Sequence, residues 1–232
     1  MTTPVTPVVV PGPTELAEAA ARWTADHLQA AVAQRGACYW AMAGGETPRG
    51  CYVRLAQPPY RDTLPWRSVF VYWSDERQVP LDDPASNYAM AKAALLDHVP
   101  IPRNQVFPLV GDPTPALRRI PASDGGWPRF DIIHLGMGED GHTASLFPGS
   151  PELLETEALV AHVRNAPKPP PERLTLTLPV INAARAVLVM VQGASKKDVL
   201  ARVLRRDPAL PASLIAPTEG ELQFIVDEAA FG

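Results

Sequence analysis

The 232-residue sequence predicts an α/β fold in which a mainly parallel sheet is covered by helices on both faces. Two observations lead to this prediction. Short apolar runs of strand length alternate with longer segments whose apolar residues recur at helical spacing. Several of the short runs are apolar throughout, as strands buried on both faces of a sheet are. Because we find no internal repeat, coiled coil or linker, we expect one domain over residues 1–232.

Composition and charge exclude several classes of protein. The net charge of −4 argues against nucleic acid or an anionic membrane as a partner. Two cysteines, Cys38 and Cys51, are too few for a disulfide framework or a four-cysteine zinc site. The N-terminal segment MTTPVTPVVVPGP lacks the basic start of a secretory signal, and no apolar run approaches the roughly 18 residues of a membrane span. We therefore expect a cytoplasmic protein.

The chain begins with an extended lead and a long helix. Residues 1–13 form the predicted lead, with a short strand at residues 8–10. A helix then starts with Thr14 as its N-cap, carries apolar residues at helical spacing, and stops at Gly36.

A strand over residues 37–43 runs directly into the loop Gly44-Gly45. Thr47 is the expected N-cap of the next helix, and Pro48 suits its first position. Two glycines before a helix leave backbone N–H groups open to an anion. The same sequence is also an ordinary strand-to-helix turn, which is the commoner use of such a pattern.

The next strand is predicted over residues 68–73. It is followed by loop residues 74–77, of which the last three are charged. A helix follows from the possible caps at residues 83–87, with its apolar positions at residues 88–99. Residues 106–110 form a possible short strand.

Residues 111–129 contain prolines and two adjacent glycines, so we expect a loop-rich connection with a brief helix at residues 116–119. Ser195 and Asp198 have the spacing of a capping box before the last clear helix. Strands are expected over residues 159–164, 173–178, 186–191 and 222–226. The strand at residues 173–178, RLTLTL, alternates as a strand with two different faces does.

The stretch FDIIHLGMGEDGHTASLFPGSP, residues 130–151, contains the strongest candidate site. A short apolar strand ends in a glycine-dense loop, which allows the backbone to approach a ligand closely. His142 has Asp140 two residues away, so it is the leading candidate for a general base. A solvated glycine-rich turn in which both residues are incidental is the alternative. Ser145 lacks a G-x-S-x-G setting, so we expect a helix cap or ligand contact rather than a nucleophile.

Four loops follow predicted strands, at Gly44-Gly45, Asp75, Asp140 and Lys196, and in a parallel sheet all lie at one edge. Helix N-termini at two of them suit a phosphorylated small molecule. The sequence contains no G-x-x-x-x-G-K-[ST] for a nucleoside triphosphate, and no H-E-x-x-H or C-x-x-C metal motif.

Four blocks of the sequence, in the right order, resemble the 6-phosphogluconolactonase family: AGGETPRGCY, WSDERQVPLDDPASNY, GMGEDGHTASLFPG and RLTLTLPVINAARAV. The resemblance implies a Rossmann-like α/β fold, a three-layer sandwich shared with the glucosamine-6-phosphate deaminases. It implies hydrolysis of 6-phospho-D-glucono-1,5-lactone to 6-phosphogluconate in the pentose phosphate pathway, with no metal or organic cofactor and no obligate protein partner. Residues 111–129 depart from the family's longer helical connection.

The resemblance also implies residue roles. His142 activates water against the lactone carbonyl, Asp140 orients or tunes it, and Asp75 assists. Arg77 binds substrate or stabilises the developing oxyanion, as do loop N–H groups near Gly138. The phosphate contacts are Gly44, Gly45, Thr47, Arg173 and Lys196, with Lys197 as a neighbour.

Two other functions stay open at this point. Without the resemblance, Arg173 is interpreted as a charged residue on an edge strand, and Lys196 as a solvated residue of a helix. A sugar-phosphate deaminase is the first alternative, but its motif resembles D-G-H-I-A-F-N-E, whereas His142 is followed here by TASLF. A non-catalytic sugar-phosphate sensor is the second, and it usually needs a DNA-binding module that we do not find.

Overall fold

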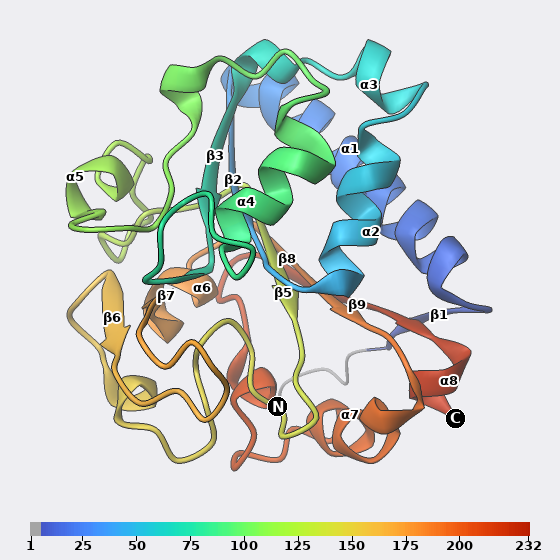
Figure 1. Cartoon of the computed structure of the whole chain (residues 1–232), viewed down its shortest axis with the longest axis vertical. Coiled ribbons are helices and arrows are strands. Elements are labelled where there is room, and N and C mark those ends of the chain that lie inside the picture. The colour runs from blue at the N-terminus through green and yellow to red at the C-terminus, as the bar shows by residue number, and fades with distance from the viewer. Residues whose placement is uncertain (1–5) are drawn as a thin grey trace.

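The computed structural model describes residues 6–232, so the first five residues of the predicted extended lead lie outside the described part. Its centre is a six-stranded sheet in the order β1-β9-β8-β5-β2-β3, in which every pair of neighbours is parallel. This confirms the predicted α/β fold with a mainly parallel sheet (Figure 1). The strands are β1 (Val8–Val10), β2 (Cys38–Met42), β3 (Val69–Trp73), β5 (Ile132–Gly136), β8 (Ala186–Val191) and β9 (Glu221–Asp227).

Helices α1 (Pro13–Arg35) and α2 (Glu46–Leu55) cover one face of this sheet (Figure 1). The β2–β5 register places Trp40 and His134 on that face, because Trp40 pairs with Ile132 and side chains two apart share a face. The His134 ring stacks on Tyr52 of α2, and its Nε2 lies 2.9 Å from Thr24 Oγ1 of α1. These contacts bury Trp40, Tyr52 and His134 completely.

The opposite face carries Tyr39, Phe70 and Tyr72, which the register places side by side. Phe107 stacks on Tyr72 with ring centroids 4.9 Å apart, and the Tyr72 hydroxyl donates to the Ala116 carbonyl. The part of the chain around Phe107 and Ala116 therefore packs over this face. Burial of both faces explains why the central strands are apolar throughout. Both faces are covered, as the sequence predicted.

A second, three-stranded antiparallel sheet has the order β4-β7-β6. Its strands are β4 (Asp75–Arg77), β7 (Arg173–Leu176) and β6 (Val160–Val163). Asp75 to Arg77 were predicted as a loop, but they pair with β7 instead. The prediction of two different faces for RLTLTL is also wrong, because β7 is the middle strand and all four of its residues are buried.

The other helices are short. They are α3 (Tyr60–Thr63), α4 (Asn87–Ala91), α5 (Thr114–Leu117), α6 (Leu178–Asn182), α7 (Lys197–Leu204) and α8 (Glu228–Phe231). One-turn helical segments lie at Trp66–Ser68, Lys92–Leu96, Arg103–Gln105, Pro151–Leu154, Ala194–Lys196 and Pro211–Leu214. The predicted helix over residues 88–99 is therefore shorter, and its second turn is a π-helix.

Three predicted helix caps are wrong. The N-cap of α1 is Gly12 rather than Thr14, because Pro13 already occupies the first helical position. The N-cap of α2 is Gly45, whose φ of 96° no threonine adopts readily, so Thr47 lies inside the helix. Ser195 lies in the one-turn helix before α7 and makes no capping bond.

The predicted strand at residues 106–110 reduces to a single bridge between Val106 and Val71. Pro108 lacks the N–H group that a longer ladder requires. In the part of the chain described, no helix combines the length and the apolar character that crossing a membrane requires.

Glu76 of β4 fixes the start of α4. Its buried carboxylate accepts hydrogen bonds from the backbone N–H groups of Arg77, Asn87 and Tyr88 at 2.7 to 2.8 Å, and from the Ser86 hydroxyl at 3.1 Å. The side chain of Ser86 also accepts from Ala89 N–H, as an N-cap does. One carboxylate therefore joins the end of β4 to the start of α4.

We predict that Glu76→Gln lowers the free energy of unfolding by about 2–3 kcal/mol, because the amide nitrogen would face donors that the carboxylate satisfies. Urea unfolding followed by circular dichroism measures the change. The matched control is Glu155→Gln, since Glu155 also accepts from two backbone N–H groups but lies at the surface. Equal stability of the two variants would contradict this role of Glu76.

Candidate active site

His142 and Asp140 form a hydrogen-bonded pair in the loop after β5. Asp140 Oδ1 lies 2.5 Å from His142 Nδ1 and 3.2 Å from the His142 backbone nitrogen. Since a carboxylate only accepts, Nδ1 carries the proton and Nε2 is left with a free lone pair. The structure therefore brings together the two residues that the sequence singled out.

Burial keeps the imidazole of this pair neutral. Burial lowers the pKa of His142 below its usual value, against the opposing effect of Asp140, and the imidazole is 16% exposed. Burial alone would raise the pKa of Asp140, but its hydrogen bonds with His142 bring it below the usual range. A neutral imidazole oriented by an ionised carboxylate has the properties of a general base near neutral pH.

Gly138 is required by the geometry of this loop. A Cβ atom on Gly138 would lie 2.1 Å from His142 Nδ1 and 2.5 Å from Asp140 Oδ1. The Gly138 N–H group donates to the His142 carbonyl at 2.9 Å, and the Gly141 N–H group donates to the Gly138 carbonyl. The N–H group of Gly138 is therefore engaged in holding the loop closed. The oxyanion contact expected from loop N–H groups near Gly138 stays a prediction.

Asp75 is the first residue of β4, two residues after the end of β3, and both of its carboxylate oxygens are occupied. Oδ2 accepts from the Ser145 hydroxyl at 2.6 Å, and Oδ1 accepts from the Asn87 amide at 3.2 Å. Asn87 also donates to the Asp75 carbonyl at 2.8 Å. The next helical segment starts at Pro151 with Ser150 as its N-cap, so Ser145 is not a helix cap. Its hydroxyl instead ties the central loop to Asp75.

Arg77, Arg173 and the Gly44-Gly45 loop line a cleft of about 90 Å³ together with Asp75 and Asn87. Arg77 Nη1 donates to the Ala85 carbonyl, whereas Arg77 Nε is buried without a partner. Gly44 approaches α4 closely, since a Cβ atom there would lie 1.9 Å from Asn87 Oδ1. Besides Asp75, four predicted site residues therefore line one cleft: Gly44, Gly45, Arg77 and Arg173. The two arginines are cationic.

Phe147 connects this cleft to the His142 loop. Its ring lies 4.7 Å from the His142 ring, centroid to centroid, and 5.6 Å from the Arg173 guanidinium carbon. The imidazole and the guanidinium therefore lie next to one aromatic ring, although His142 comes from the loop after β5 and Arg173 from β7.

Lys196 and Thr47 lie outside the residues that line the cleft. Lys196 Nζ lies 3.9 Å from Glu139 Oε1, and burial lowers the pKa of its ammonium group. Lys196 is therefore next to the His142 loop, as predicted from the four-loop arrangement. Lys197 is exposed, and Thr47 is half-buried in the first turn of α2.

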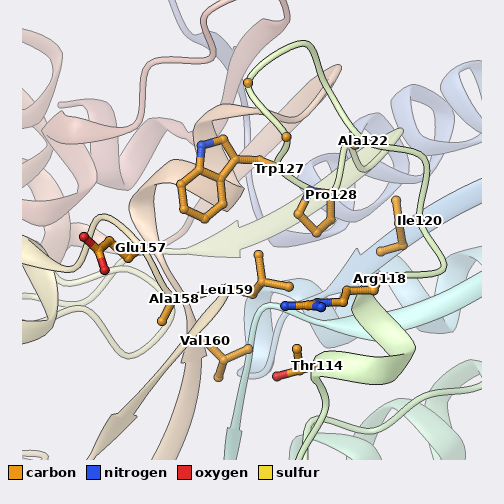
Figure 2. Close-up of a pocket in the computed structure, with 12 residues that line it drawn as sticks. Thr114, Arg118, Ile120, Ala122, Trp127, Pro128, Glu157, Ala158, Leu159 and Val160 are labelled. Atoms are coloured by element: carbon orange, nitrogen blue, oxygen red, sulfur yellow. The ribbon is translucent and has the colours of Figure 1, made fainter.

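A larger cavity, about 630 Å³, lies elsewhere, between residues 114–128 and residues 157–160 (Figure 2). Trp127, Arg118 and Glu157 surround it, and no predicted site residue does. The chemistry of the side chains, rather than cavity size, therefore locates the candidate active site.

Sequence reasoning did not assign Asn87, Phe147 or Lys168 to the site. Asn87 was considered only as a helix cap, and nothing local predicts that its amide reaches Asp75 across twelve positions. Phe147 directly follows the glycine-rich loop, so its place in the sequence could have indicated that it lies next to the candidate base. Lys168 lies in the proline-rich segment between the strands predicted over residues 159–164 and 173–178, to which no role was assigned from the sequence.

Residues 11–224 match the family described as glucosamine-6-phosphate isomerases/6-phosphogluconolactonase. A 6-phosphogluconolactonase of Synechocystis sp. is 41% identical over 214 residues, which cover 86% of each chain. That of Mycobacterium leprae is 37% identical over 239 residues, covering 91% of this chain and 92% of the relative. The solved structure of the Trypanosoma brucei 6-phosphogluconolactonase has a TM-score of 0.82 at 31% identity, covering 97% of this chain and 98% of that one. The chain therefore belongs to the glucosamine-6-phosphate isomerase/6-phosphogluconolactonase family.

Proposed function

We propose that this protein hydrolyses 6-phospho-D-glucono-1,5-lactone to 6-phosphogluconate, the second step of the pentose phosphate pathway. The observation that carries the proposal is the His142–Asp140 pair beside a cleft with two arginines. Its relatives named 6-phosphogluconolactonase support the same reaction and a small sugar-phosphate substrate. The one-domain organisation, the cytoplasmic location and the absence of an obligate protein partner stay predictions.

In this mechanism His142 Nε2 accepts a proton from water while the water oxygen bonds to C1 of the lactone. Arg77, which lines the cleft, stabilises the oxyanion that forms on the carbonyl oxygen. The C1–O5 bond then breaks, and the His142 imidazolium returns the proton to O5. The product is a carboxylic acid, which ionises in water.

Asp140 has a positioning role, because its bond to Nδ1 directs Nε2 away from the loop. Asp75 has a similar role toward the cleft, since Ser145 and Asn87 occupy both carboxylate oxygens. Arg173, Lys196 and the backbone of Gly44, Gly45 and Thr47 hold the phosphate. Helix α2 begins at Glu46, so its free N–H groups favour an anion there.

The direct test is to add the purified protein to freshly prepared 6-phosphogluconolactone and to follow acid release. We expect a rate well above spontaneous opening and no comparable release of ammonia from glucosamine 6-phosphate. The deaminase is disfavoured because the residues after His142 supply no carboxylate for ring opening. Ammonia release at a rate that rivals lactone hydrolysis would overturn the proposal.

We predict that His142→Ala lowers kcat by roughly 10²–10⁴, the range typical of a lost general base, while product binding is largely kept. In the wild type, kcat/KM should fall as the pH drops through the His142 pKa, because the protonated imidazole cannot accept a proton. Burial lowers that pKa, so this fall should occur below about pH 6.5.

The matched control is His162→Ala, since His162 is exposed and pairs with Glu172. A folded His142→Ala protein with the kcat of His162→Ala would show that the water is activated by another group.

We predict that Lys196→Gln lowers kcat/KM for the phosphorylated lactone about tenfold or more, whereas hydrolysis of unphosphorylated gluconolactone changes less than about twofold. The reason is that a cation at the phosphate end stabilises the bound phosphate, which gluconolactone lacks. Lys197→Gln is the control, because Lys197 is the exposed neighbour with the same charge. Equal losses on both lactones would place Lys196 at the carbonyl end or in the fold.

A further inference from the structure

The loop between β6 and β7, residues 165–171, has no role in the mechanism above. Four of its seven residues are proline, which restricts its backbone. The Ala166 N–H group donates to the Pro171 carbonyl at 3.1 Å and closes the loop. The loop therefore presents its exposed residue Lys168 on a short, restricted backbone.

Arg173 anchors this loop to the cleft. Its Nη2 donates to the Lys168 carbonyl at 2.7 Å, and its Nε donates to the Pro170 carbonyl at 3.0 Å. Nη1 lies 3.3 Å from the Ser145 hydroxyl, so three of the five N–H groups of a guanidinium are engaged by the protein. Arg173 is 4% exposed and lines the cleft, so the loop backbone is fixed by a residue of the site itself.

The charges already assigned to the site balance each other. Three cations, Arg77, Arg173 and Lys196, are matched by three carboxylates, Asp75, Glu139 and Asp140. His142 is neutral near pH 7, because burial lowers its pKa. A sugar phosphate brings nearly two negative charges, so a balanced site gives it little net attraction.

Lys168 supplies the missing positive charge. Among residues 6–232 its ammonium group forms no ion pair, whereas Lys196 is next to Glu139. Its charge acts on both parts of the site, since it lowers the pKa of His142 and that of Lys196, in each case less than burial does. An unpaired, exposed cation at this place is free to contact a bound anion.

We propose that Lys168 is a substrate-binding residue whose ammonium group contacts the phosphate of the bound sugar phosphate. This inference rests on the proposed function and adds a fourth cation to the site, the third at its phosphate end. Because Arg173 holds the carbonyl of Lys168, the buried arginine and the exposed lysine form one unit around the phosphate.

The first test compares Lys168→Gln with Lys168→Arg and with the control Lys92→Gln. Lys92 is a surface lysine paired with Asp97, outside the site. We expect Lys168→Gln to lower kcat/KM for 6-phosphogluconolactone about tenfold, mainly through KM, and Lys168→Arg to retain most of it. Hydrolysis of unphosphorylated gluconolactone should change less than about twofold in all three variants at the pH optimum.

The second readout is the pH dependence of kcat/KM with unphosphorylated gluconolactone. Asp140 and Asp75 raise the pKa of His142, and Lys168 lowers it. Removing the lysine charge should therefore move the acidic limb to higher pH in Lys168→Gln, and Lys168→Arg should leave it unchanged. A loss of loop structure without a lost charge would not produce this difference between the two variants.

The proposal is overturned if Lys168→Gln behaves as Lys92→Gln does, or if both lactones are affected equally. If the wild-type protein hydrolyses no lactone, the proposed function fails. In that case calorimetric titration with 6-phosphogluconate still tests whether Lys168 contacts the phosphate. Binding about tenfold weaker in Lys168→Gln than in Lys92→Gln would support the contact. Equal affinities would contradict it.

Discussion

The parallel direction of the central strands is the constraint on which the site depends. Because β2, β3, β5 and β8 run the same way, the segments that follow them lie at one edge of the sheet. Asp75, His142 and Lys196, which are far apart in the sequence, come from three of these segments. A single antiparallel strand at the centre would move one of them to the opposite edge, so the chemistry follows from the topology.

Buried polar contacts then determine how these segments meet. Asp75 joins three parts of the chain, since Ser145 comes from the central loop and Asn87 from α4. Glu76 holds the same helix start from the other side of the strand. Two glycines make the close approaches possible, because a Cβ atom on Gly44 or Gly138 would overlap a side chain of the site. The positions of the functional groups therefore depend as much on these partners as on the strands.

The sequence predicted what depends on local pattern. The six parallel strands follow from apolar runs, and the His142–Asp140 pair follows from two residues in one tight turn. The caps at Thr14 and Thr47 were wrong because a proline and a positive φ moved each helix start to a glycine. Asn87 could not be assigned, since its contact with Asp75 depends on how α4 packs. The roles of the site residues stay predictions until activity is measured.

We infer that the loops at one edge of the parallel sheet, together with Arg173 of the second sheet, hold a carbonyl end at His142 and a phosphate end at Arg173 and Lys196. A crystal structure of the wild-type protein with 6-phosphogluconate tests it most directly. We expect the phosphate within hydrogen-bonding reach of Arg173 and Lys196, and the C1 carboxylate next to His142 Nε2 and Arg77. A product bound in the reverse direction, or in the large cavity near Trp127, would rule out this arrangement of the two ends.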